Sequence, residues 1–139
     1  MIGRELALAL RDAGLVWTPE SGDRFALDLP DAVESEVEAE VFTVSEMTIE
    51  PQAFSTDTVL GFNGTTEWAL DSVALEDALW LPREDQLREL LRGTFRALRR
   101  RADTHEVEIE VRGESLTFEH PQPEDAYALA VLELLRRVA

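Results

Sequence analysis

Residues 105–119 read His-Glu-Val-Glu-Ile-Glu-Val-Arg-Gly-Glu-Ser-Leu-Thr-Phe-Glu, and this stretch decides the fold class. Glutamates alternate with aliphatic residues before Gly113, and apolar residues take alternate positions after it. A period of two is that of a strand with one buried face. We therefore expect a hairpin that pairs 105–111 with 114–119, as in the one-sided antiparallel sheets of α+β proteins. Its inward-facing residues are expected to be Val107, Ile109, Val111, Leu116 and Phe118.

Two registers of this hairpin stay open. A turn at Arg112-Gly113 places His105 directly opposite His120, where two imidazoles could share a metal ion or act as a proton switch. A turn at Gly113-Glu114 packs the apolar residues better and separates the histidines. Two imidazoles without a third ligand make a weak metal site, so we expect no metal.

The stretch before the hairpin predicts the longest helix, from Pro82 to about Arg101. Proline suits the first helical position, and apolar side chains recur at helical spacing from Leu87 to Leu98. Arginines 99–101 would complement the negative C-terminal end of such a helix. After the hairpin, residues 124–138 predict the last helix.

The N-terminal half predicts one helix followed by strands. Residues 3–13 suit a helix that Gly14 ends, with Leu10 and Leu15 placed for the apolar contact of a Schellman cap. Residues 31–40 are left open as strand, helix or mobile loop. Further on, Asn63-Gly64 suits a type I′ turn. The other extended segments are expected at 15–18, 24–29 and 41–50, and a hairpin is expected to pair 58–62 with 65–70.

Together these elements predict a single α+β domain over residues 1–139. Its expected order is one helix, five strands, a second helix, a two-stranded hairpin and a third helix, with the mostly antiparallel sheet packed by the three helices. The length of 139 residues suits one domain.

The net charge of the chain limits the classes of partner that it is expected to bind. The net charge is -16, and all 13 basic residues are arginine. The far field of such an anion repels nucleic acid and anionic lipid, so we expect neither nucleic acid nor membrane as partner. The N-terminus lacks the pattern of a signal peptide, and cysteine is absent, so we expect a cytoplasmic protein.

No motif in the sequence predicts catalysis. The glycine-rich turn at 61–66 lacks the lysine of a phosphate-binding loop, and no serine has the context of an activated nucleophile. Among 29 acidic residues, close carboxylate pairs are expected by chance. We therefore expect no catalytic residue, no cofactor and no metal. These features favour a non-enzymatic protein and leave the question of enzymatic activity open.

The arginines are the strongest candidates for binding a partner. Seven of the 13 lie between residues 83 and 101. On the predicted helix, Arg88, Arg92, Arg96 and Arg100 would form one row beside the apolar stripe. This row could grip an acidic partner, or it could lie across an acidic strand and be neutralised there. The partner-binding candidates are Arg88, Arg92, Arg96, Arg99 and Trp80.

The tryptophans call for a similar choice between core and surface. Trp68 shares a predicted strand face with Leu70 and is expected in the core. Trp80 precedes Leu81-Pro82 and is expected to pack on the start of the long helix, partly exposed.

Three stretches resemble a family of small acidic actinobacterial proteins without an established activity, of which some members are labelled pilus assembly proteins. They are residues 47–50, 61–71 and 81–91, which read Met-Thr-Ile-Glu, Gly-Phe-Asn-Gly-Thr-Thr-Glu-Trp-Ala-Leu-Asp and Leu-Pro-Arg-Glu-Asp-Gln-Leu-Arg-Glu-Leu-Leu. The resemblance implies no catalytic residues. At the level of fold, the order of elements, size and acidity are also similar to the dimeric chaperones of type III secretion.

Three functions are consistent with these features. The first is a non-enzymatic, chaperone-like module that binds a protein partner, itself included as a homodimer. The second is a small-molecule-binding protein or small enzyme with a pocket near Trp68 and Trp80. The third is an immunity-type protein that binds a basic partner through the glutamates of residues 34–40.

Overall fold

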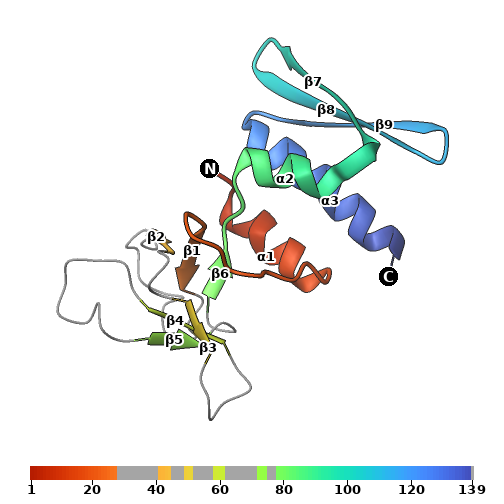
Figure 1. Cartoon of the computed structure of the whole chain (residues 1–139). Coiled ribbons are helices and arrows are strands. Elements are labelled where there is room, and N and C mark those ends of the chain that lie inside the picture. The colour runs from red at the N-terminus through yellow and green to blue at the C-terminus, as the bar shows by residue number, and fades with distance from the viewer. Residues whose placement is uncertain (28–40, 45–48, 52–57, 62–71, 75–77, 139) are drawn as a thin grey trace. The chain divides into compact units, whose positions relative to one another are not determined.

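The computed structural model describes residues 1–27, 41–44, 49–51, 58–61, 72–74 and 78–138 (Figure 1). These residues form an α+β protein whose paired strands are antiparallel, which confirms the predicted fold class. They group into two compact units, one of residues 1–16 and 82–139 and the other of residues 17–81. Among the described residues, no helix is both long and apolar enough to cross a bilayer.

The first unit contains three α-helices and one three-stranded sheet within its described part. The helices are α1 (Arg4–Asp12), α2 (Glu84–Leu91) and α3 (Pro123–Val138). The strands are β7 (Phe95–Arg101), β8 (Thr104–Val111) and β9 (Glu114–His120), and β8 lies between the other two. Within this unit, α2 and α3 lie on one side of the sheet (Figure 1).

The core of the first unit lies between the sheet and the helices. Val107 and Ile109 of β8 are fully buried, and α3 buries a run of small and apolar side chains that includes Tyr127. Alternate residues of β8 point to opposite faces, so its valine and isoleucine point toward the helices and its glutamates to the other face. This is the one-sided sheet that the alternation in the sequence predicts.

The end of α1 is the Schellman cap that the sequence predicts. The N–H of Leu15 donates to the carbonyl of Leu10 over 3.0 Å, and the N–H of Gly14 donates to that of Arg11 over 3.0 Å. Gly14 has φ 109, a left-handed conformation that costs glycine little. Local residue chemistry alone ends this helix.

The second unit contains two three-stranded antiparallel sheets in its described part. One has the order β2 (Val41–Thr43), β1 (Arg24–Leu27), β6 (Ala78–Trp80). The other has the order β3 (Ile49–Pro51), β4 (Thr58–Gly61), β5 (Ser72–Ala74). Phe25 is fully buried in the first sheet and packs with Val44 and Ala78.

The prediction of one long helix from Pro82 to Arg101 is wrong. Helix α2 ends at Leu91, a 3-10 turn covers Arg92–Thr94, and β7 follows. The helix also begins two residues later than expected, because the side-chain amide of Gln86 accepts the N–H of Arg83 at 2.9 Å and caps the helix there.

Several strand boundaries also differ from those predicted. The expected strand over 41–50 is two strands, because β2 pairs with β1 whereas β3 pairs with β4. Residues 15–18 form no strand. Strand β4 pairs with both β3 and β5, and Leu60 lies opposite Val73 of β5. The second strand of the hairpin predicted for 58–62 and 65–70 lies outside the described residues. The predictions for 31–40, Asn63-Gly64 and Trp68 lie outside the described residues.

Candidate binding surface on the three-stranded sheet

Strand β7 begins where the backbone leaves the helical conformation. Arg92, the residue after α2, has φ 51 and ψ -132, and Gly93 follows it. The hydroxyl of Thr94 donates to the carbonyl of Leu91 over 2.6 Å, which satisfies one of the free carbonyls at the helix end. The chain is then extended from Phe95 onward and pairs with β8.

The arginines of β7 bind the glutamates of β8. The Nε atom of Arg96 lies 2.9 Å from a carboxylate oxygen of Glu110. Arg99 reaches two carboxylates through Nη1, Glu106 at 3.1 Å and Glu108 at 2.6 Å. Together with the pair of Arg101 and Glu106, at 3.1 Å, these contacts form a ladder of ion pairs on the face of the sheet opposite to Val107 and Ile109. We call this set of six residues the ion ladder.

Glu106 lies at the centre of the ion ladder. It is 8 % exposed, and one carboxylate oxygen accepts from Arg99 while the other lies against Arg101. Its burial acts to raise the pKa of the carboxyl, but the charge of Arg101 and hydrogen bonds with Arg99, Glu119 and Arg101 outweigh this and lower the pKa below its ordinary value. Glu106 is therefore held as a carboxylate.

Arg99 is the cation with the most extensive contacts in the ion ladder. The hydrogen bond and charge of Glu108, followed by those of Glu106, raise the pKa of Arg99 above its ordinary value. Both contacts use Nη1. A guanidinium carries five N–H donors, so the ion ladder leaves donors of this side chain for a further acceptor.

The two edges of this sheet differ in charge. Strand β7 carries four arginines and no acidic residue, whereas β9 carries Glu114 and Glu119 and no arginine. In the described part of the chain, each of the two strands pairs with β8 alone. The sheet thus has one basic and one acidic edge, and the basic edge lies on a chain of net charge -16.

The register shows which backbone groups point to the open edge of β7. Residues of an antiparallel strand direct their N–H and C=O groups to alternate sides. Arg101 pairs with Thr104 across a two-residue turn, which makes them a hydrogen-bonded pair. Arg99 and Arg101 therefore direct their backbone groups toward β8, and Leu98 and Arg100 direct theirs to the open edge.

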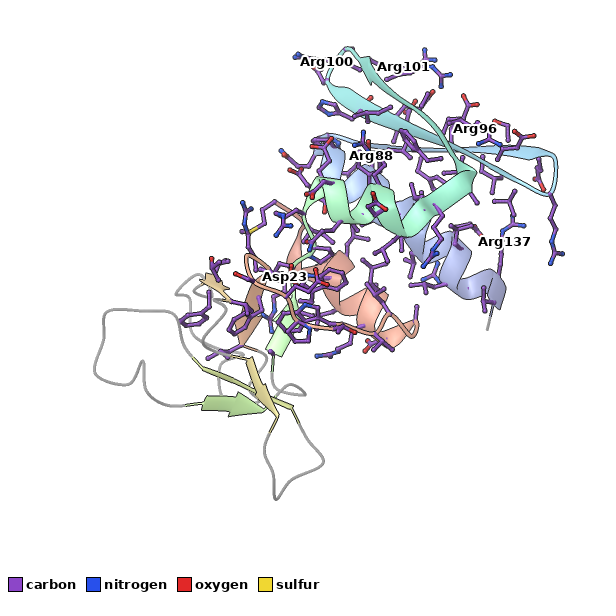
Figure 2. The ribbon with its side chains drawn as sticks, viewed as in Figure 1. Asp23, Arg88, Arg96, Arg100, Arg101 and Arg137 are labelled. Carbon is purple, nitrogen blue, oxygen red and sulfur yellow. The ribbon has the colours of Figure 1, made fainter. Side chains whose placement is uncertain are left out.

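Leu98 and Arg100 also have exposed side chains at this edge. Leu98 is 36 % exposed, and Arg100 has no ion pair among the described residues. Figure 2 shows Arg100 and Arg101 near the turn between β7 and β8, and Arg96 farther along the strand. Backbone groups, an apolar side chain and a guanidinium are thus all accessible along one edge.

The structure does not form the predicted row of arginines on one helix. Arg88 lies on α2, Arg92 follows the helix, and Arg96, Arg99 and Arg100 belong to β7. The reason is that the helix ends at Leu91. The alternative interpretation was that the arginines lie across an acidic strand and are neutralised there. Arg96 and Arg99 are paired in this way with glutamates of β8.

Arg88 takes part in a small pocket instead. Its guanidinium carbon lies 6.0 Å from the centre of the Phe95 ring, within the range of a cation–π contact. Glu84, Asp85, Arg88 and Tyr127 line a pocket of about 260 Å³. Burial, and then the charge of Glu84, raise the pKa of Tyr127. The pocket is slightly smaller than the roughly 300–1,000 Å³ of ordinary ligand sites.

Trp80 belongs to the unit of residues 17–81, whereas the four candidate arginines belong to the other unit. Its ring stacks on that of Trp17, with centroids 6.2 Å apart and planes inclined by 6°. The indole N–H of Trp17 donates to Asp23 over 2.9 Å, whereas the buried Nε1 of Trp80 has no hydrogen-bond partner among the described residues. The side chain is partly buried, as expected.

The hairpin has the register that places the histidines together. His105 is directly opposite His120, and the turn residues Arg112 and Gly113 have φ 53 and 81. The Nδ1 atom of His120 accepts the N–H of Gln122 at 3.1 Å. Within the described residues, no group of three or more potential ligands that could hold a metal ion is present.

Sequence reasoning missed the central part of the site. The glutamates of β8 alternate with the residues expected to face inward, which predicts a solvent-exposed face for them, yet Glu106 is buried against two arginines. Leu98 and Arg101 lie in a segment that the sequence predicts as helix and that forms β7. One signal was available. The arginines at 96, 99 and 101 precede an alternating row of glutamates at 106, 108 and 110, as a charged antiparallel hairpin requires.

A comparison of the chain with known protein families, with curated proteins and with solved structures finds no match. The arguments below therefore rest on the geometry of the described residues.

Proposed function

We propose that this chain is a non-enzymatic module that binds a protein partner through the open edge of β7. The observation that supports this most is the charge of that edge, because β7 has four arginines and no acidic residue and, in the described part of the chain, pairs with β8 alone. Exposed strand edges are templates for pairing with another chain. The arginine side chains of β7 would then determine which partner segment can pair with this edge.

A chaperone-like role is the form of this function that agrees best with the acidity of the chain. A protein of net charge -16 stays soluble and resists non-specific association with other anions. An acidic segment can still bind next to the arginines, because salt largely screens the repulsion from acidic residues more than about 8–10 Å away at physiological ionic strength. The resemblance to small acidic actinobacterial proteins stays a prediction.

The test is site-specific photo-crosslinking in cells. A photoreactive p-benzoylphenylalanine replaces Arg100 at the β7 edge, and in a matched variant it replaces Thr117 at the β9 edge. Both residues are exposed, and both direct their backbone groups away from β8 by register. We expect adducts with a defined protein from position 100 alone, identified by mass spectrometry of the joined peptides.

Two outcomes would contradict this function. Equal adducts from both positions would mean non-specific collision, and no adduct from either would leave the β7 edge without a partner. Adducts of position 100 with a second copy of this chain would identify the partner as itself, in a homodimer.

A further inference from the structure

The ion ladder shows what kind of strand β7 accepts. On its paired side, β7 binds β8, in which glutamates alternate with aliphatic residues from Glu106 to Val111. The glutamates meet the arginines on one face of the sheet, and on the other face Leu98 lies opposite Val107. Strand β8 is thus an example, within the molecule, of a sequence complementary to β7.

The open side of β7 presents the same residues to a new neighbour. The side chains of Arg99 and Arg101 lie on one face, where they bind glutamates of β8 and are still 43 % and 58 % exposed. Leu98 and Arg100 lie on the other face, and their backbone groups are directed outward. A strand added at this edge would find backbone donors and acceptors, guanidinium donors on one face, and an exposed leucine on the other.

We propose that the open edge of β7 accepts an extended acidic segment of a partner protein as an added strand, with glutamates or aspartates alternating with aliphatic residues. This inference rests on the proposed function and names the chemistry of its partner. In strand addition, main-chain hydrogen bonds supply affinity and alternate side chains supply specificity. Here the acidic residues would bind the arginine face, and the aliphatic residues would cover Leu98.

A second copy of this chain fits the same edge less well. Two β7 edges would set four arginines against four, and like charges on facing strands are destabilising. The β9 edge of another copy offers only Glu114 and Glu119, five positions apart instead of alternating. A contact between β7 and β9 would also be head-to-tail, and such contacts form closed rings or open filaments instead of dimers.

The probe is a synthetic peptide that repeats the Glu-Val-Glu-Ile-Glu-Val order of β8, capped at both ends. A control peptide has lysine in place of each glutamate. Each peptide is titrated into the full chain and the heat of binding is measured by calorimetry. We expect the acidic peptide to bind and the lysine peptide not to bind. Sizing with light scattering on the same samples reports whether the chain associates with itself.

Proline at Arg100 blocks strand addition without removing a bond to β8. Because the N–H of Arg100 points to the open edge, Arg100→Pro takes away a donor that the sheet does not use, and proline is tolerated at such edge positions. We expect Arg100→Pro to weaken peptide binding by about tenfold through the lost main-chain hydrogen bond. Arg100→Ala keeps that N–H and removes only a charge on the face opposite to the acidic residues, so we expect it to weaken binding by a few-fold at most. Thr117→Pro makes the matching change at the β9 edge and should leave binding unchanged.

Amide hydrogen exchange on the unmodified chain gives a readout that needs no variant. Bound peptide should slow the exchange of the Leu98 and Arg100 amides, and those of Ser115 and Thr117 should stay as they are. Equal binding of the lysine peptide, protection at β9 instead of β7, or no effect of Arg100→Pro would each overturn strand addition by an acidic segment.

Failure of this inference differs from failure of the proposed function. If the peptide does not bind and cross-links from position 100 still join a partner, the edge binds a protein of different chemistry. If the cross-links are also absent, the function itself is wrong. Self-association that Arg100→Pro abolishes would assign the edge to a second copy and would overturn the acidic partner.

Discussion

The two faces of β8 are stabilised by different interactions. On one face Val107 and Ile109 are fully buried against the helices, so their stabilisation comes from removal of apolar surface from water and from close packing. On the other face the glutamates bind arginines that are still about half exposed, where ion pairs contribute little to stability. The difference indicates that the apolar face determines whether the sheet folds, and the charged face determines what it binds.

Removing a side chain from the apolar face should have the largest effect. Ile109→Ala deletes buried methyl groups and leaves a cavity in a closed core. We expect a loss of about 2–5 kcal/mol in the free energy of unfolding, measured by urea denaturation. A loss below about 1 kcal/mol would mean that this face carries less of the stability than its burial indicates.

The turn that joins β8 to β9 should show a smaller effect. Gly113 has φ 81 with open space around its Cα, so Gly113→Ala meets no neighbour and only strains the backbone. We expect a loss of roughly 1–2 kcal/mol. Gly93→Ala is the matched control, since Gly93 is equally uncrowded and has no left-handed φ. If both variants lose the same stability, backbone strain is not the cause.

The contribution of the charged face to the free energy of unfolding should be clearest in its dependence on pH. The pKa of Glu106 is lowered in the folded state, so its contribution is present above the pKa of an unfolded glutamate, about 4.3. It is lost as the pH falls through the lower folded pKa. We expect Glu106→Gln to reduce stability at pH 7 by less than Ile109→Ala does, and to make the acid limb of the stability profile shallower. Parallel acid limbs for the two proteins would contradict this origin.

The outer end of the ion ladder should show the smallest effect. Arg96 and Glu110 are each more than 40 % exposed, and solvent screens such pairs. We expect Glu110→Gln to change the free energy of unfolding by at most about 0.5 kcal/mol. A loss as large as that of Glu106→Gln would mean that burial does not distinguish the two glutamates.

Some elements were predictable because neighbours in the sequence determine them. Helix α1 ends at Asp12, and Gly14 after it allows both backbone bonds of the Schellman cap to form. The hairpin of β8 and β9 follows from strict alternation and a turn with glycine. The pairing of the two strands was predictable from local residues, whereas the choice between the two registers was not, because both place a glycine in the turn.

The candidate site was not predictable in the same way, because the conformation of residues 95–101 depends on a distant pairing. Arginine and leucine favour helix on their own, and the spacing from Leu87 to Leu98 suits one. Pairing with β8 satisfies the backbone groups as well as a helix would. It also brings Arg99 within reach of Glu106, which a helix over these residues would not do. Tertiary context outweighs local propensity here.

Local sequence was thus sufficient to predict the α+β class, the cap of α1 and the division of β8 into an apolar and a charged side. The physical reason is that caps, turns and alternation act over a few residues. Three further features follow from long-range pairing: the arginines belong to an edge strand, Glu106 is buried against two of them, and Leu98 and Arg100 direct their backbone groups outward. These features depend on the order and register of strands, which come from contacts between segments that are separated along the chain.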